Sequence, residues 1–386
     1  MQGFIYLQKS RISSLQKFKL SVIIGFFWCS FLFQLHAQSG FGLAYSPAKF
    51  VQHSKKATFD SPSYSYLIDL RCSLLEQKMV AWKKYWNNPK IQLHAAYIDY
   101  GDAHILGKAF GVFPSIGFSV VRLKNYQLRF QIGSGIAYVT KVYDKIDNPK
   151  NSAIGAHLNN ITQIAFANTM HLSSDFVAIM DLHLTHVSNS ATSTPNAGLN
   201  LVGASIGIYK KFQNQKPKTN IALSDSVFTV HHRWFLDAHY GYGISEYSFA
   251  GGPKFKVDVS NLGVGYHISR FFHVMVGGEY EFKRSTFQFF YHDFETEAVA
   301  RILATRWSAY GSGQMDFGPI SIRGQVGTYI FKDALIQNTF PYYVKLTTII
   351  SPFPKNWQLQ PYLGVQLKSH GAVAQYLALL SGIRWR

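Results

Sequence analysis

Apolar and polar residues alternate along most of the chain, with the two-residue period of β-strands. Residues 127–138 place Leu, Phe, Ile and Tyr on one face and Gln, Arg and Gly on the other, and residues 357–367 oppose Trp, Leu and Val to Gln and Gly. The segments 234–244, 272–282 and 320–330 repeat this arrangement. Because the strand period dominates, the pattern predicts an all-β chain.

The composition of the polar face separates two β architectures. A soluble β-sandwich also alternates, but its polar face is the solvent side and is normally rich in Lys and Glu. Here the polar face consists of Gly, Gln, Ser and single charges, and Tyr and Trp gather towards the segment ends. This favours an antiparallel transmembrane β-barrel with a lipid-facing outside, an enclosed polar interior and aromatic girdles. A secreted soluble sandwich is the alternative.

The number of alternating segments predicts the size of the barrel. We count about eight between residues 90 and 213, with a less distinct start near residue 41, and about eight more between 230 and 386, and even totals are expected of bacterial barrels. Polar residues 213–228 separate the halves, either as a long loop in one barrel of up to about 16 strands or as a linker between two modules. We therefore divide the mature chain into 38–212 and 213–386.

The first 37 residues have the organisation of a secretory signal peptide. Four basic residues precede an apolar run from Val22 to Phe33, which is too short to span a bilayer, and Ala37 offers a small residue for cleavage. Cleavage there would remove four of the 38 basic residues and none of the 20 acids, which leaves a net charge of +14. It would also leave Cys72 as the only cysteine, so no internal disulfide is expected.

Composition and charge limit where the protein can act and which partners it can bind. Charged residues make up 15% of the chain, against about 25% in soluble domains, and aromatic residues make up 16%. The mean hydropathy of −0.02 is not that of a helical membrane protein. An exported basic chain is expected to meet lipid phosphates rather than nucleic acid, although loop charge without a specific partner would give the same balance. The final alternating segment, with Trp385 next to last, resembles the assembly signal of outer-membrane barrels.

One pair of segments carries a candidate catalytic site. His186 and Ser188 lie two positions apart, so on a strand they share one face and the imidazole can take the hydroxyl proton. They have the parity of the apolar residue Leu184, which puts them on the lipid-facing wall. With a hairpin at 190–197, Asn200 returns to the same wall, in position to orient the imidazole as the third member of a triad does.

These residues resemble the active-site strand pair of PagL-type lipid A 3-O-deacylases, which are outer-membrane barrels whose catalytic His and Ser face the lipid. The resemblance rests on His-x-Ser-Asn at 186–189, Pro-Asn-x-Gly at 195–198 and the polar residue at position 200. It implies His186 as the base, Ser188 as the nucleophile, Asn189 as an oxyanion-hole contributor and Asn200 at the acid position. Asn can orient an imidazole but cannot stabilise an imidazolium by charge, and loss of a triad carboxylate can reduce turnover by about 10⁴.

The resemblance covers about residues 90–212 and is strongest at 181–200. Motifs at 99–107 and 148–159 also resemble a longer branch of the same family. It implies a serine esterase in the outer membrane of a Gram-negative bacterium, which removes an ester-linked acyl chain from the lipid A of lipopolysaccharide. The alternative is a non-catalytic barrel, a porin or a structural protein, that keeps the motif as a relic.

The sequence contains no zinc-binding Cys/His pattern, phosphate-binding loop or dinucleotide fingerprint. We therefore expect no cofactor and no metal in the reaction. Nothing in the sequence predicts the oligomeric state.

Overall fold

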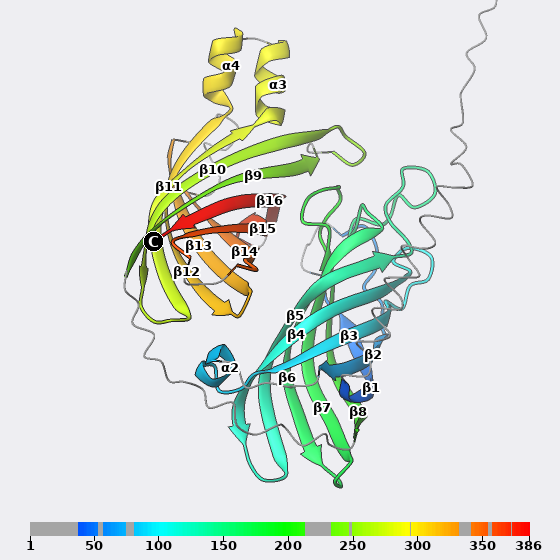
Figure 1. Cartoon of the computed structure of the whole chain (residues 1–386). Coiled ribbons are helices and arrows are strands. Elements are labelled where there is room, and N and C mark those ends of the chain that lie inside the picture. The colour runs from blue at the N-terminus through cyan, green and yellow to red at the C-terminus, as the bar shows by residue number, and fades with distance from the viewer. Residues whose placement is uncertain are drawn as a thin grey trace, which may run out of the picture.

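The structure, a computed structural model, describes residues 38–52, 57–74, 81–212, 233–246, 249–293, 295–331, 341–353, 357–371 and 373–386. The predicted signal peptide at 1–37 and the polar segment at 213–228 lie outside the described residues. The described part of the chain contains sixteen antiparallel strands, which form two closed barrels (Figure 1).

The first barrel is built from eight strands, each paired with the next, and β1 pairs with β8 to close it. The strands are β1 (Gln38–Phe50), β2 (Ser65–Leu74), β3 (Lys90–Asp99), β4 (Lys108–Arg122), β5 (Tyr126–Val139), β6 (Leu158–His171), β7 (Phe176–Ser188) and β8 (Leu199–Lys211). The short helix α2 (Ala81–Tyr85) lies between β2 and β3. The eight-strand prediction is confirmed, but the count starts at residue 38, because β1 and β2 both precede residue 90.

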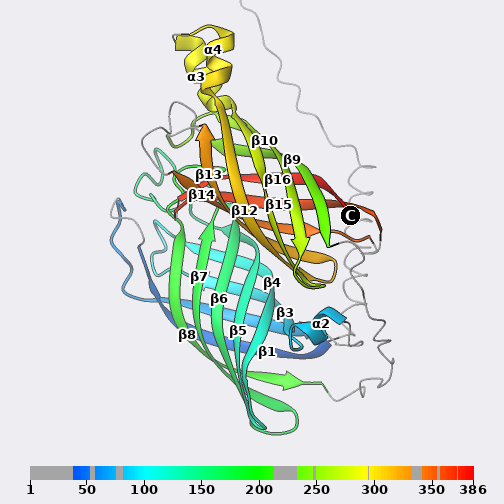
Figure 2. The same cartoon turned by 90° about the vertical axis from the view of Figure 1, so that its left-hand side faces the viewer.

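The second barrel also has eight strands and closes through the pairing of β9 with β16. Its strands are β9 (Trp234–Glu246), β10 (Lys254–His267), β11 (Phe272–Lys283), β12 (Thr305–Phe317), β13 (Ile320–Phe331), β14 (Tyr342–Ile350), β15 (Leu359–His370) and β16 (Val373–Trp385). Helices α3 (Arg284–Asp293) and α4 (Glu297–Leu303) connect β11 to β12 and project beyond the strands (Figures 1 and 2). The strands thus make two barrels and not one larger barrel. None of the helices in the described part of the chain has the length and hydropathy needed to span a membrane.

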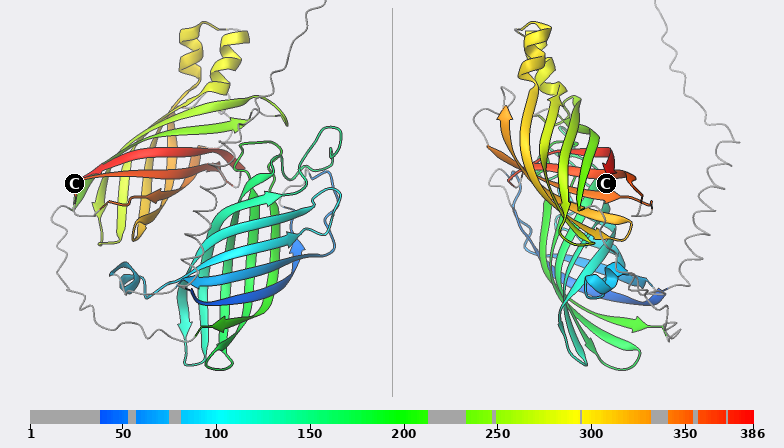
Figure 3. Two further views of the ribbon diagram at one scale, coloured as in Figure 1. Left: turned by 45° about the vertical axis from the view of Figure 1, so that its right-hand side comes forward. Right: turned by 60° about the vertical axis from the view of Figure 1, so that its left-hand side comes forward.

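Side chains alternate between the outer wall and the lumen along the strands of both barrels. On β7, Leu182 is 60% exposed and Asp181 is 4% exposed, and on β10, Leu262 is 62% exposed and Asn261 is 5% exposed. Figure 3 shows the two walls from further directions. An apolar outside around a polar interior is the reverse of a soluble fold and is typical of a transmembrane β-barrel. The predicted fold class is therefore confirmed.

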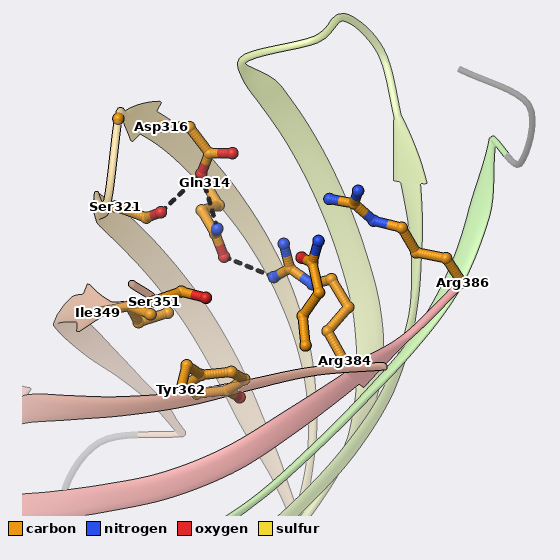
Figure 4. Close-up of a pocket in the computed structure, with 10 residues that line it drawn as sticks. Gln314, Asp316, Ser321, Ile349, Ser351, Tyr362, Arg384 and Arg386 are labelled. Carbon is orange, nitrogen blue, oxygen red and sulfur yellow. Dashed lines mark hydrogen bonds between the residues drawn. The ribbon is translucent and has the colours of Figure 1, made fainter. Parts of the chain in front are cut away.

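Ion pairs fill the lumen of the second barrel. Asp237 accepts hydrogen bonds from Arg323 at 2.9 Å and from Arg384 at 3.0 Å, and all three side chains are buried. At one end of the lumen Arg384 also reaches Gln314 at 2.9 Å, and Asp316 accepts hydrogen bonds from Gln314 at 2.9 Å and from a neighbouring serine (Figure 4). The side chains drawn there leave a cavity of about 20 Å³. Because buried charges need partners, this network stabilises the barrel only while it is complete.

The two barrels touch each other at both ends. We call the end where β7 passes to β8, and the corresponding end of the second barrel with α3 and α4, the loop end, and the opposite end of each barrel the turn end. At the turn end, the indole of Trp86, next to α2, donates to the carbonyl of Asp316 at 3.0 Å. At the loop end, the N–H of Glu246 donates to the carbonyl of Ala191 at 3.2 Å. Like ends therefore meet, as two barrels in one membrane require.

Replacement of Asp237 by Ala should destabilise the second barrel, because it leaves Arg323 and Arg384 buried without their shared carboxylate. Breaking such a buried pair costs about 3–5 kcal/mol of the free energy of unfolding, which a urea titration of the protein in vesicles would measure. Arg301→Ala is the control, since the pair of Arg301 with Glu297 is 61% and 57% exposed and should contribute no more than about 1 kcal/mol. Equal effects of the two variants would contradict this assignment.

Candidate active site

Strands β7 and β8 bring three of the predicted site residues into one hydrogen-bonded array. The register places His186 directly opposite Asn200, and Ser188 lies two residues beyond His186 on the same face. The Nδ1 atom of His186 lies 2.7 Å from Oδ1 of Asn200, and its Nε2 atom lies 2.9 Å from the hydroxyl oxygen of Ser188. The imidazole therefore bridges an orienting side chain and a hydroxyl, which is the arrangement of a nucleophile and its general base.

A contact with Val51, the residue that follows β1, fixes the orientation of the Asn200 amide. Its Nδ2 group donates to the carbonyl of Val51 at 3.2 Å, so the amide oxygen faces the imidazole. An oxygen there can only accept, and the proton of a neutral His186 must therefore be on Nδ1. This tautomer leaves the lone pair of Nε2 directed at the hydroxyl of Ser188, as proton abstraction requires.

The array lies on the outward face of the first barrel, at its loop end. His186, Ser188 and Asn200 are half-buried, and they continue the rows of exposed residues that include Leu184 and Val202. The backbone neighbours of His186 on β7 point into the lumen and are buried. The hydroxyl of Ser188 is thus presented outside the barrel and not to its interior.

Three polar residues that sequence reasoning overlooked extend this site across the wall. Asn160 on β6 lies opposite Ser188 and donates to the hydroxyl of Ser134 on β5 at 2.9 Å. Thr162, opposite His186, donates to the side-chain oxygen of Asn160 at 2.8 Å. All three side chains lie on the outward face of their strands. The two-residue period of β5 and β6 would therefore have identified them as polar residues on the apolar wall.

The connection between β7 and β8, residues 189–198, holds the fourth predicted residue. The N–H of Asn189 donates to Oδ1 of Asn196 at 2.9 Å, and the carbonyl of Asn189 accepts two hydrogen bonds from Thr192. The side-chain nitrogen of Asn189 is buried and has no hydrogen-bond partner among the described residues. Its side-chain oxygen accepts from the N–H of Ser193, so Asn189 is held in the connection while its Nδ2 donor stays unused.

Gly198 packs directly against the imidazole. A Cβ atom at this position would lie 2.5 Å from Cε1 of His186, and the φ angle of +81° is one that other residues rarely adopt. The glycine of the Pro-Asn-x-Gly motif is thus needed both for the turn into β8 and for the position of His186.

A second loop, which contains Ala153 and Ile154, packs against the 189–198 connection. The N–H of Gly198 donates to the carbonyl of Ala153 at 2.9 Å, and Ile154 forms a β-bridge with Asn196. The buried Asn151 fixes this second loop, because its side chain binds the carbonyl of Ile105 at 2.8 Å and accepts from two backbone N–H groups. The motif at 148–159 therefore organises the support of the site and not its chemistry.

An open apolar groove of about 650 Å³ lies on the outer wall beside the rows that follow the array. Below the His186 and Asn200 pair, the next row pairs Leu184 with Val202, and the row after it pairs Leu182 with Ala204. Further lining residues come from β6 and from the β1 and β2 side, namely Ile164, Phe166, Ala48, Lys49 and Tyr64. The groove therefore lies one row along the strands from the array, on the same outer wall.

A similar triad lies inside the first barrel but is closed off. His94 binds Asp69 through Nδ1 at 3.0 Å and the hydroxyl of Ser115 through Nε2 at 2.8 Å. All three side chains are buried in the lumen, and Asp69 is also paired with Arg71. An ester could not reach Ser115, so this triad serves the packing of the lumen. No group of three or more His, Cys, Asp and Glu side chains in the described residues could hold a metal ion.

Residues 74–209 match the family model described as lipid A 3-O-deacylase (PagL). The matched segment runs from the end of β2 to the end of β8 and includes the whole array. It confirms the resemblance that the sequence motifs carry. No curated protein matches the chain.

Several solved structures of porins are similar to the chain over most of its length. The KdgM porin has 8% identity and a TM-score of 0.18, with 89% of this chain and 98% of that chain covered. The NanC porin has 7% identity and a TM-score of 0.16 over 89% and 99% of the two chains. A mutant of the Rh. blastica porin has 10% identity and a TM-score of 0.17 over 90% and 98%.

If Nε2 of His186, 2.9 Å away, takes the proton of Ser188, this outward-facing hydroxyl should react selectively with a lipophilic fluorophosphonate. Mass spectrometry of the labelled protein should find the adduct on Ser188, and His186→Ala should abolish it. Gly198→Ala should reduce labelling as well, because the added Cβ displaces the imidazole. Labelling that persists in the His186 variant would show that the hydroxyl is not activated by this histidine.

Proposed function

We propose that this chain, whose residues 74–209 match the lipid A 3-O-deacylase (PagL) family model, is an outer-membrane serine esterase that removes an ester-linked acyl chain from lipid A. The observation that carries the proposal is the array of Asn200, His186 and Ser188 on the outward face of the barrel. A soluble substrate would have no reason to approach an apolar wall. A membrane lipid, by contrast, would lie against such a wall.

The geometry supports a two-step acyl transfer. The hydroxyl oxygen of Ser188 attacks the ester carbonyl while Nε2 of His186 takes its proton, and the tetrahedral intermediate places a negative charge on the former carbonyl oxygen. In this proposal the side-chain nitrogen of Asn189, which has no hydrogen-bond partner among the described residues, stabilises that oxyanion. When the intermediate collapses, His186 returns the proton to the sugar alkoxide, which leaves. Water, activated by the same imidazole, then hydrolyses the acyl-Ser188 ester and releases a fatty acid.

Asn200 takes the place of the triad acid by orientation alone. Its bond to Val51 directs the amide oxygen at His186 and so fixes the working tautomer. It adds no negative charge to stabilise the imidazolium, and turnover is therefore expected to be slower than in a triad with a carboxylate.

The wall beside the array fits an amphiphilic substrate. The groove below Ser188 is lined by Leu182, Leu184 and Val202, which suit an acyl chain. Lys49 lines the edge of the groove and is exposed, and a long Lys side chain can carry its charge up to the level of lipid phosphates. The groove thus supports a substrate that has both an acyl chain and an anionic headgroup.

The porin alternative receives less support. An open porin requires a water-filled lumen. In the second barrel Glu281 pairs with Arg306 and Lys368, each at 2.6 Å, and Asp237 pairs with Arg323, all with buried side chains. These networks occupy the space that a conducting pore would need.

Replacement of Ser188 by Ala should leave lipid A fully acylated, because it removes the nucleophile. The test is mass spectrometry of lipid A from cells that express the natural chain or the variant. The natural chain should cause the loss of one hydroxyacyl mass, and Ser188→Ala should not.

Ser115→Ala is the matched control. It removes a serine hydroxyl that lies 2.8 Å from a histidine Nε2, as the Ser188 hydroxyl lies 2.9 Å from His186, but this hydroxyl is buried in the lumen. It should assemble and deacylate like the natural chain. Deacylation that continues in Ser188→Ala, or that stops only in Ser115→Ala, would refute the proposed site.

A bulky residue in the groove should change the chain-length preference. Ala204→Phe would fill the row below Leu184 and Val202, so hydrolysis of a laurate ester should fall by about tenfold while that of a butyrate ester changes little. Ile206→Phe lies one row further and outside the groove lining, and it serves as the control. An equal loss on both esters would mean that the groove does not hold the acyl chain.

A further inference from the structure

The second barrel contacts the loop that carries the candidate oxyanion donor. Glu246, the last residue of β9, accepts hydrogen bonds at its carboxylate from the backbone N–H and from the hydroxyl of Thr194, the latter at 2.8 Å. The N–H of Glu246 donates to the carbonyl of Ala191 at 3.2 Å. One residue of the second barrel therefore holds two points of the 189–198 connection.

The conformation of that connection needs such support. Ser190 and Ala191 have φ angles of 56° and 66°, in the left-handed region that residues with a Cβ disfavour. Two such residues in succession would relax to other conformations unless hydrogen bonds from outside hold them. The bond from Glu246 to Ala191 acts directly at the second of these positions.

A short chain of contacts links Glu246 to the nucleophile. Thr194, which Glu246 binds, lies two residues before Asn196. Asn196 accepts from the N–H of Asn189, and Asn189 follows Ser188 in the sequence. A shift of Thr194 would therefore move the side chain that fixes Asn189.

We propose that the second barrel is an intramolecular scaffold for the active-site loop, and that Glu246 is its positioning residue. This inference rests on the proposed function. It gives the second barrel a task in the reaction, although the described residues of its outer wall carry no His and Ser array of their own. The turn-end contact supplies the second point of attachment, because Trp86 binds Asp316 and Tyr85 binds Ser269 at 2.9 Å. Held at both ends, the second barrel cannot turn away from the loop without breaking one of the two contacts.

The test compares variants of the full chain in vesicles that contain lipid A. Glu246→Ala should lower kcat about tenfold with little change in KM, because a misplaced oxyanion donor weakens the transition state more than substrate binding. Glu246→Gln should restore most of the rate, since its amide oxygen can still accept from Thr194. Tyr85→Phe removes one hydrogen bond between the barrels at the turn end, where the bond from Trp86 to Asp316 remains, and should leave kcat unchanged.

A second readout does not depend on activity. Hydrogen exchange of the 189–198 amides, followed by mass spectrometry, should accelerate about tenfold in Glu246→Ala and should stay slow in Glu246→Gln and Tyr85→Phe. Thr194→Ala should slow the enzyme less than Glu246→Ala, since its backbone N–H still donates to Glu246, and it should add little to Glu246→Ala, where the hydroxyl contact is already lost.

The outcomes separate the two proposals. Unchanged exchange and unchanged kcat in Glu246→Ala would overturn the role of Glu246. If Tyr85→Phe lowered kcat and accelerated exchange as much as Glu246→Ala, contact between the barrels would matter only for overall stability. That result would also overturn the role of Glu246. If Ser188→Ala keeps its activity, the proposed function fails, and the exchange measurement still decides whether Glu246 holds the loop.

Discussion

Closure of the hydrogen-bonded sheet is the constraint on which the rest of this structure depends. In a closed barrel each strand pairs on both sides, so every residue points either into the lumen or away from it. The register between β7 and β8 then decides which outward residues become neighbours, and it places His186 opposite Asn200. A slip by one residue would send the histidine into the lumen and separate it from the amide.

The two faces of the sheet handle polar groups in different ways. In the lumen, polar side chains satisfy one another in closed networks, such as Asp69 with Arg71 and His94. On the outer wall most side chains are apolar, and a polar group there lacks the solvent that a soluble protein would offer it. The cluster around His186 and Ser188 is an exception that hydrogen bonds among its own members sustain. Such exceptions are expected at functional sites.

The sequence predicted what depends on near neighbours in the chain. The parity of His186 and Ser188, and the return of Asn200 after a short hairpin, need only a two-residue period and a turn. The division into two barrels was left open, because it depends on pairings between distant strands, of β1 with β8 and of β9 with β16. The contact of Glu246 could not be predicted either, because it joins residues of different barrels that no periodicity relates.

The amide at position 200 has a consequence for the electrostatics of the resting site. The Asn200 amide and the Ser188 hydroxyl carry no formal charge, so no carboxylate lies on either side of the His186 imidazole in this array. A carboxylate on a wall that faces lipid would be costly to insert and would repel a phosphorylated substrate. An array with an amide at this position costs less desolvation to insert, so in the proposed enzyme the residue expected to slow the chemical step would also make the site easier to place in the membrane.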